Sequence, residues 1–382
     1  MKRYLFIWLL LLYTTSTFAQ QSLSTIPSRI ISPSINSDGS VTFSLYMPNA
    51  KQVSIKGDWL INGSASMQLT NGIWSYQTST LLPDVYIYTF NVDGVDLIDP
   101  SNVYQIRDAS TLYSIFMIEG TSHMYGVKDI SHGTVSHRWY PSPTLNKQRR
   151  LSIYTPPGYE SSKKKYPVLY LLHGMGGDEE AWLNLGRVSQ ILDNLIESGK
   201  ASPMIVVMSN GNVVQQATPG QDSKGFYMPS FLLPHTMDGE FESSFNDILA
   251  FIESNYNVKK NKAGRAIAGL SMGGYHSLYI SANNPELFDY IGLFSPAIYP
   301  NKGIASTIYE KMDEKLMQQA KQGYKLYWIG IGKDDFLYND VAKQRNQMNA
   351  LHMPYIYRET DKGHVWTNWR NYLSEFVTLI FK

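Results

Sequence analysis

The sequence predicts an α/β fold with a mainly parallel sheet, preceded by a small all-β, immunoglobulin-like sandwich. The chain has 382 residues, a typical length for two domains, and its 43% content of hydrophobic residues is that of globular proteins. Residues 27–120 contain short alternating apolar segments, whereas residues 137–382 contain continuous apolar runs between helical patterns. These patterns place the sandwich first and the α/β domain second.

The first 19 residues have the composition of a secretory signal peptide. Lys2 and Arg3 supply positive charge, an apolar run from Leu5 to Tyr13 follows, and small residues precede a cleavage point before Gln20. This run is too short for a stable membrane-spanning helix, which disfavours a membrane anchor. We therefore expect a secreted or periplasmic mature protein, with no membrane association after signal removal.

Short strands and tight turns alternate between residues 31 and 118. Asp-Gly and Asn-Gly pairs, which tolerate positive φ, separate the expected strands. The strands are expected at residues 41–46, 52–56, 72–76 and 85–92. This spacing is typical of a β-sandwich, and no amphipathic helix of useful length interrupts it.

Beyond a linker at about residues 119–136, buried strands alternate with helical segments. The strands are expected at residues 168–172, 205–208, 265–268, 290–294, 326–331 and 355–357. Between the first two, apolar residues from Val188 to Ile196 recur at helical spacing, and Gly199 is a candidate C-cap. Apolar strands joined by helices predict a parallel sheet with crossovers.

Composition limits the partners and cofactors. The formal net charge of +1 argues against nucleic acid or anionic lipid as a partner. The absence of cysteine excludes disulfides, thiolate metal sites and a cysteine nucleophile. No Asp, Glu or His group has the spacing of metal ligands, and no dinucleotide-binding glycine pattern occurs, so we expect neither metal nor cofactor.

Residues 269–273, Gly-Leu-Ser-Met-Gly, fit the pattern of a nucleophile elbow. The expected strand at residues 265–268 precedes them, and a helix is expected to begin near Tyr275. Glycines suit this position because a sharp strand-to-helix turn leaves no room for Cβ atoms beside the serine. The pattern predicts Ser271 as a nucleophile.

A glycine-rich segment, His-Gly-Met-Gly-Gly at residues 173–177, follows the buried strand at 168–172. Such a turn can direct backbone N–H groups towards a developing oxyanion, and the residue after the nucleophile supplies a second donor. We therefore predict an oxyanion hole made by Met175 and Met272, with His173 in a structural role. A phosphate-binding loop is excluded because no Gly-Lys-Ser/Thr follows.

A serine nucleophile requires a general base, and His364 is the candidate. It follows the last expected strand and precedes a terminal helix. We expect a structural role for His352, and His276 is too close to Ser271 in sequence to reach it.

The acid that orients the base is expected after the strand at residues 326–331. Asp335 is preferred because it falls three residues after Gly332, and the adjacent Asp334 stays an alternative. The order Ser271, Asp335, His364 is that of the α/β-hydrolase fold.

These motifs together resemble carbohydrate esterase family one, the feruloyl and acetylxylan esterases of the esterase-D-like α/β-hydrolases. The matching segments are residues 150–159, 166–174, 266–274 and 363–370. Members use Ser, Asp and His in this order, so the resemblance also implies Ser271, Asp335 and His364. It further implies a secreted serine esterase that removes feruloyl or acetyl groups from plant cell-wall polysaccharide such as xylan.

The N-terminal part resembles the early-set sandwich found ahead of glycan-active enzymes, related to carbohydrate-binding module family forty-eight. The matching segments are residues 41–43, 47–50, 57–59, 93–95 and 99–102. Trp59 and Trp74 are candidates for stacking on sugar. Such modules also serve as packing partners that shape the rim of an active site.

The acyl group cannot be deduced from the sequence, because residues 213–241 contain no recognisable motif. Trp182 and Trp366 are the predicted substrate contacts, with Phe226 and Tyr227 as further aromatic candidates, although each could belong to a core. A siderophore esterase of the enterobactin type is the alternative, and a strongly basic pocket would favour it. A non-catalytic glycan-binding protein is disfavoured by the complete set of Ser, Asp and His.

Overall fold

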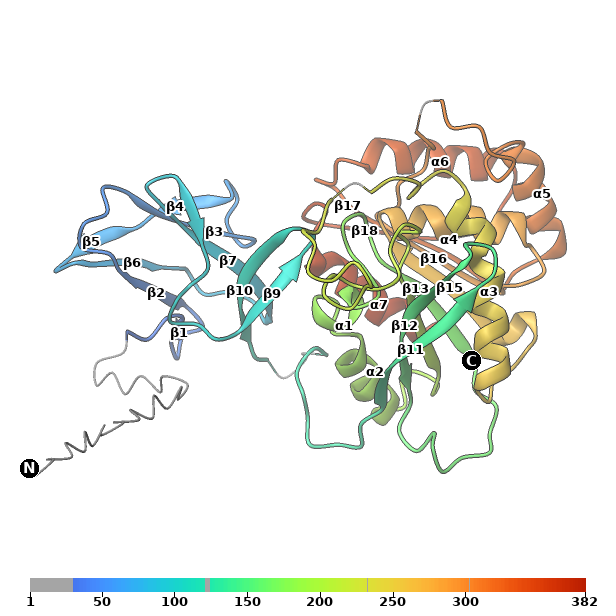
Figure 1. Cartoon of the computed structure of the whole chain (residues 1–382), viewed down its shortest axis with the longest axis horizontal. Helices are drawn as coiled ribbons and strands as arrows, with labels where there is room; N and C mark the ends of the chain where they lie inside the picture. The colour runs from blue at the N-terminus through green and yellow to red at the C-terminus, as the bar shows by residue number, and fades with distance from the viewer. Residues whose placement is uncertain (1–29, 121–123, 232, 302) are drawn as a thin grey trace, which may run out of the picture.

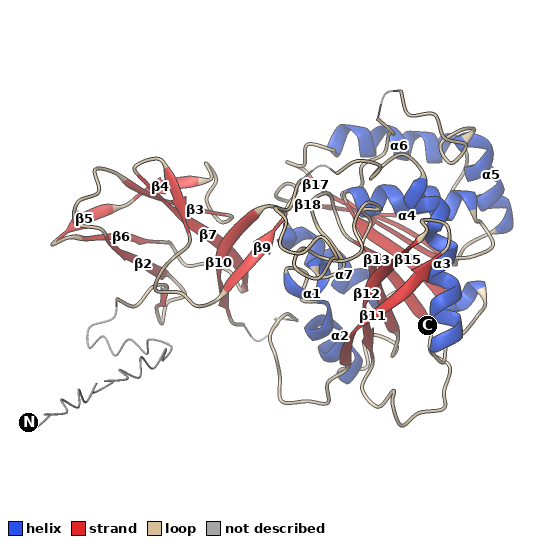
Figure 2. Cartoon of the chain, in the orientation of Figure 1, coloured by secondary structure: helices blue, strands red, loops and turns tan. Residues whose placement is uncertain are grey.

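The computed structural model describes residues 30–120, 124–231, 233–301 and 303–382. The predicted signal peptide therefore lies outside the described residues. The described chain forms two lobes that lie side by side, an all-β N-terminal lobe and a C-terminal lobe of helices around a sheet (Figure 1). Colouring by secondary structure makes the division plain (Figure 2).

The N-terminal lobe consists of two antiparallel sheets. The first has the order β1 (Ser34–Ile35), β2 (Val41–Tyr46), β6 (Ile73–Gln77), β5 (Gln68–Thr70). The second has the order β4 (Ser64–Ser66), β3 (Val53–Gly57), β7 (Asp84–Val92), β10 (Thr111–Ile118), β9 (Gln105–Asp108), and β8 (Val95–Leu97) pairs with β7. The four strands expected from the sequence are present, whereas the β9–β10 hairpin was not expected.

Aromatic side chains fill the space between these two sheets. The rings of Phe43 and Trp59 stack with centroids 5.3 Å apart, and Phe116 packs edge-on against Trp59 at 5.5 Å. Trp74 is 8% exposed and donates its indole N–H to the Met47 carbonyl. Trp74 is therefore a core residue and does not form a sugar-stacking surface, contrary to its candidacy from the sequence.

One mixed eight-stranded sheet forms the centre of the C-terminal lobe. In order across the sheet the strands are β11 (Thr134–Ser142), β12 (Lys147–Thr155), β14 (Ile205–Ser209), β13 (Val168–Leu172), β15 (Arg265–Leu270), β16 (Tyr290–Phe294), β17 (Leu326–Gly332) and β18 (Ile356–Thr360). The pairs β11–β12 and β12–β14 are antiparallel, and the other pairs are parallel. The prediction of a mainly parallel sheet agrees with this arrangement.

Helices cover both faces of this sheet. One face packs against α3 (Glu240–Asn255), α4 (Met272–Asn283), α5 (Met312–Gln322) and α6 (Tyr338–Ala350). The other packs against α1 (Ala181–Asn184), α2 (Val188–Glu197) and α7 (Trp366–Val377). A short 3-10 helix, η1 (Lys262–Gly264), precedes β15. Buried strands between two helical layers explain the continuous apolar runs in the sequence.

Several expected boundaries differ from the structure. The segment expected as a linker already enters β11 at Thr134, and the last strand is Ile356–Thr360 rather than residues 355–357. The helix after Ser271 begins at Met272, not near Tyr275, because the elbow passes directly from strand to helix. Among the described residues, no helix is both long and apolar enough to cross a bilayer.

Ion pairs and hydrogen bonds join the two lobes. Arg370 of α7 donates to Asp84 Oδ1 at 2.8 Å and to the Val85 carbonyl at 2.9 Å, at the start of β7. Thr367 donates to the second oxygen of Asp84 at 2.6 Å. At the tip of the β9–β10 hairpin, Arg107 pairs with Asp178 of the C-terminal lobe. The hairpin is thereby held against the C-terminal lobe (Figure 1).

Candidate active site

The order of strands creates a crevice at the carboxyl edge of the sheet. From β13 the chain crosses to β14 on one side and later enters β15 on the other. Ligands of open α/β sheets bind where the strand order reverses in this way. The segment 173–177 follows β13 and Ser271 follows β15, so the two predicted catalytic segments emerge from neighbouring strands.

Ser271 occupies a strained elbow between β15 and α4. Its backbone has φ 53° and ψ −115°, a region that non-glycine residues rarely adopt. The backbone is held from three sides: its N–H donates to Phe294 O at 2.9 Å, and its carbonyl accepts from Tyr275 and Ala297 at 3.0 Å. A Cβ at Gly273 would lie 2.3 Å from Leu172 O, so this close approach requires glycine.

His364 and Asp335 form a hydrogen-bonded pair. His364 Nδ1 lies 2.9 Å from Asp335 Oδ2, and Asp335 Oδ1 accepts from the Leu337 N–H at 2.9 Å. The Asp335 side chain is fully buried, whereas the neighbouring Asp334 is exposed. This contact places the imidazole proton on Nδ1, which donates it in a hydrogen bond to the carboxylate, and Nε2 is left as an acceptor.

Aromatic rings lie on both sides of the His364 imidazole. Trp369 meets it edge-on with centroids 4.8 Å apart, and Phe336 lies 4.6 Å away at 50°. Phe336 itself is 75% exposed. The imidazole is thus held by a buried acid and a buried ring while one exposed ring covers it.

The segment after β13 lies directly against the serine. A Cβ at Gly174 would lie 2.4 Å from a Leu270 methyl carbon and 3.3 Å from Ser271 Cβ. Within the described chain, neither the Met175 N–H nor the Met272 N–H donates to a protein acceptor. Both amides are therefore free to donate to a ligand, and the oxyanion hole made by Met175 and Met272 stays a prediction.

His173 holds the base of this segment. The ring is buried, its Nδ1 donates to Gly174 O at 2.7 Å, and its Nε2 accepts from the Gly211 N–H at 2.7 Å. Burial lowers the pKa of His173 to about 4, so the imidazole is neutral at neutral pH. Its position fits the structural role expected for it.

Ser271, His364, Met175 and Met272 line one cavity of about 660 Å³. Other walls are aromatic or apolar: Phe231, Met237, Tyr299, Phe336, Trp366 and Trp369. The last wall comes from the β9–β10 hairpin of the N-terminal lobe and includes Asp108 to Thr111 and Tyr113. The cavity is therefore closed by both lobes.

The two predicted tryptophan contacts have different environments. Trp366 lines the cavity and its indole N–H lies 3.4 Å from Asp108 Oδ2. Trp182 is 1% exposed, donates to Leu172 O and packs behind Trp366, so its prediction as a substrate contact is wrong. Of the other aromatic candidates, Phe226 is fully exposed and neither it nor Tyr227 lines the cavity.

Sequence reasoning missed five aromatic residues of the cavity wall: Tyr113, Phe231, Tyr299, Phe336 and Trp369. Phe231 lies in the segment without a motif, and Tyr299 lies in the loop after β16. Phe336 directly follows Asp335, and this adjacency was the one available signal for it.

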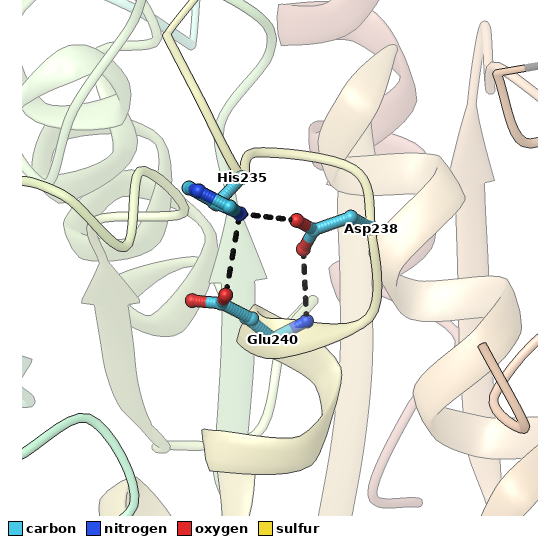
Figure 3. Close-up of side chains that lie close together, drawn as sticks. All are labelled: His235, Asp238 and Glu240. Atoms are coloured by element: carbon cyan, nitrogen blue, oxygen red, sulfur yellow. Dashed lines mark hydrogen bonds and ion pairs between the residues drawn. The ribbon is translucent and has the colours of Figure 1, made fainter. Parts of the chain in front are cut away.

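The other histidines weighed from the sequence, and His235, do not line the cavity. His276 is buried on α4 and its Nδ1 lies 2.8 Å from Glu242 Oε1, whereas His352 is exposed. His235 Nδ1 lies 2.6 Å from Asp238 Oδ2 and 3.2 Å from Glu240 Oε1 (Figure 3). The spacing of these three residues gave no sign of a cluster. Because His235 Nδ1 already contacts both carboxylates, we interpret the three residues as an exposed ion-pair group.

Comparison with known proteins places this architecture in a family. Residues 142–379 match the model of a family described as "Putative esterase". The chain is 32% identical over 275 residues to the endo-1,4-beta-xylanase/feruloyl esterase of Xylanibacter ruminicola, a match that covers 70% of this chain and 36% of that protein. The chain thus spans about a third of that relative's length.

Two solved structures are similar in fold. A ferulic acid esterase, 28% identical, covers 66% of this chain and 100% of its own, with a TM-score of 0.54. The enterobactin esterase FES from Shigella flexneri, 17% identical, covers 89% of this chain and 92% of its own, with a TM-score of 0.62. At that identity the likeness concerns the fold alone.

These likenesses support an α/β-hydrolase-like fold for the C-terminal lobe, whereas the immunoglobulin-like topology of the all-β lobe stays a prediction. The family model covers well over half of the chain and includes Ser271, Asp335 and His364. The chain therefore belongs to the family described as "Putative esterase".

Proposed function

We propose that the protein is a secreted serine carboxylic-ester hydrolase that removes feruloyl groups from plant cell-wall polysaccharide such as xylan. The observation that carries the proposal is one cavity lined by Ser271, by His364 with Asp335 hydrogen-bonded behind it, and by two residues with unengaged backbone amides. The names of the relatives reported above support the ester class.

The proposed reaction proceeds through an acyl-enzyme. Ser271 Oγ attacks the ester carbonyl while His364 Nε2 takes its proton, and Asp335 stabilises the resulting imidazolium. The N–H groups of Met175 and Met272 hold the oxyanion of the tetrahedral intermediate. Collapse of the intermediate breaks the bond to the sugar oxygen, which receives the proton from His364. Water, activated by the same imidazole, then releases the acid and restores Ser271.

The cavity walls favour an aromatic acyl group over acetyl. Tyr299, Phe336 and Trp366 offer faces and edges against which a phenyl ring can pack. An acetyl group would leave most of a 660 Å³ cavity without contacts. Acetyl ester hydrolysis is therefore the secondary activity of this proposal.

The fold shared with the Shigella enterobactin esterase favours a siderophore esterase as the second candidate. Ferric siderophores are anionic and require cationic side chains. The described residues that line the cavity include no Lys or Arg, and Asp108 adds negative charge. The electrostatics of the cavity therefore support the neutral feruloyl ester.

Export is part of the proposal and rests on residues 1–19, whose charge and apolar run match a signal peptide. The proposed domains are a sandwich at residues 27–120 and an esterase domain at 137–382. The partner of the exported enzyme would be the polysaccharide or its feruloylated oligosaccharides.

Parallel hydrolysis of methyl ferulate, acetylated xylan and a triester siderophore by wild type and Ser271→Ala tests the proposal. We expect ferulate release by the wild type and its loss in the variant. Acetate release alone would change the substrate to acetylxylan, and siderophore cleavage alone would favour the second candidate. Equal activity of the variant would contradict the serine mechanism.

A further inference from the structure

A second cavity, of about 470 Å³, adjoins the active-site cavity. The two cavities share Asp108, Ala109, Gly177 and Ala181 among their lining residues. Because these four residues line both cavities, the polar cleft is the immediate neighbour of the cavity at Ser271. Its lining residues come from the β9–β10 hairpin, at Arg107 to Ala109, and from several segments of the C-terminal lobe. Its volume falls in the range of about 300–1,000 Å³ that is typical of small-molecule sites.

The charges in this cleft are paired within the protein. Arg107 pairs with Asp178, and it donates to Thr218 Oγ1 at 3.0 Å. Arg150 pairs with the buried Glu179 at 2.7 Å and with Glu180. Because a carboxylate accompanies each guanidinium, the cleft presents no unbalanced cation to an anionic ligand.

Three side chains of the cleft have polar atoms without a protein partner. The amides of Asn184 and Gln221 are exposed and make no hydrogen bond to other described residues. His137 uses Nδ1 towards Ser152 Oγ at 3.0 Å, which leaves its Nε2 open. An amide offers both donors and an acceptor, which is the pattern that vicinal sugar hydroxyls complement.

An ester has an acyl side and an alcohol side, and the two cavities differ accordingly. Aromatic and apolar side chains line most of the cavity at Ser271, whereas ion pairs and amide side chains line the adjoining cleft. Burying the hydroxyl groups of a sugar against aromatic walls would leave them unpaired, at a cost that the polar cleft avoids.

We propose that the cleft between the β9–β10 hairpin and the C-terminal lobe binds the sugar that bears the ester, through Asn184 and Gln221. This inference rests on the proposed function, because it assigns the alcohol side of the same substrate. The hairpin of the N-terminal lobe supplies one wall of this cleft, at Arg107 to Ala109. The ligand class is a neutral, hydroxyl-rich saccharide.

The test compares two ferulate esters that differ only in the alcohol. One is methyl ferulate, and the other is ferulate esterified to an arabino-xylo-oligosaccharide. The variants are Asn184→Ala, Gln221→Ala and the double variant, and neither side chain lines the cavity at Ser271. Gln322→Ala, an exposed amide at the end of α5, is the matched control.

We expect each single variant to lower kcat/KM for the saccharide ester by about three- to tenfold, the scale of one hydrogen bond. The double variant should lose more, while methyl ferulate hydrolysis changes less than about twofold in all variants. A second readout is the Kd of the saccharide ester in a Ser271→Ala background, which should rise by the same factor. Gln322→Ala should match the wild type throughout.

Equal losses on both esters, or no loss on either, would overturn the assignment of the cleft. So would a wild type that shows no preference for the saccharide ester over methyl ferulate. If the wild type cleaves neither ester, the proposed function fails instead, and the Kd measurement still reports on the cleft. The two failures are thus distinguishable.

Discussion

Asp335 and Asp334 are a matched pair of adjacent carboxyl groups, and only Asp335 contacts His364. In Asp335→Asn, the amide oxygen can keep the 2.9 Å hydrogen bond from the Leu337 N–H. The amide NH₂ then faces His364 Nδ1, where Asp335 Oδ2 accepts a hydrogen bond at 2.9 Å in the wild type. A donor at this position forces the imidazole proton to Nε2, and His364 can no longer accept the Ser271 proton.

The expected loss is about 10⁴-fold in kcat, the scale known for the same change in a serine protease triad. That loss corresponds to about 5.4 kcal/mol of transition-state stabilisation, since each tenfold is about 1.36 kcal/mol. Asp334→Asn is the control, and because Asp334 is exposed its kcat should stay within about twofold of the wild type.

The assay is steady-state hydrolysis of methyl ferulate at neutral pH, with thermal unfolding of each variant recorded to exclude misfolding. Asp335→Asn should keep a KM close to that of the wild type, because the amide replaces an oxygen outside the substrate cavity. Retention of kcat within tenfold in Asp335→Asn would refute the assigned role of Asp335. An equal loss in Asp334→Asn would refute it as well.

Three further predictions concern stability, pH and the acyl pocket. Arg370→Met should lower the free energy of unfolding by about 3–5 kcal/mol, because it leaves the buried Asp84 carboxylate without its cation. Urea unfolding measures this loss. The double variant Arg370→Met, Asp84→Asn should recover part of it. Because the folded pKa of His173 is about 4, below the usual 6.5, its contribution to stability is present above pH 6.5 and is lost as pH falls towards 4. In urea unfolding His173→Gln should therefore lose less stability than the wild type between pH 7 and pH 5, and parallel curves would contradict this. Phe336→Ala should raise the KM for methyl ferulate by about fivefold, because the acyl ring loses one aromatic contact. The KM for 4-nitrophenyl acetate, whose acyl group has no ring, should not change. An equal rise in KM for both esters would indicate a displaced His364 instead.

The parts of the fold that could be predicted are those where burial determines the residue type. The strands β13, β14 and β16 are buried at every position and appear in the sequence as uninterrupted apolar runs. The edge strand β11 is mostly exposed, so its residues carry no such signal, and its first three residues, 134–136, were assigned to the linker. The β9–β10 hairpin is half-exposed and mixed in composition, which hid both its strands and its place at the active site.

The candidate site was predictable where chemistry and backbone geometry restrict the residue. The glycines around Ser271 follow from a turn that admits no Cβ, and His364 follows from chain order. The environments of Trp182 and Trp366 depend on packing between α1 and α7, and composition alone does not distinguish them. Asp334 and Asp335 differ only in which way the turn after β17 directs their side chains.

The central claim is that Ser271 forms a covalent acyl-enzyme. Mass spectrometry of the intact protein after reaction with a fluorophosphonate tests it, followed by peptide mapping. One adduct per chain should form, located in the peptide that contains Ser271, with ferulate hydrolysis abolished in proportion and no adduct in Ser271→Ala. An unlabelled wild type with full ferulate hydrolysis, or a Ser271→Ala variant that still hydrolyses ferulate, would contradict the mechanism.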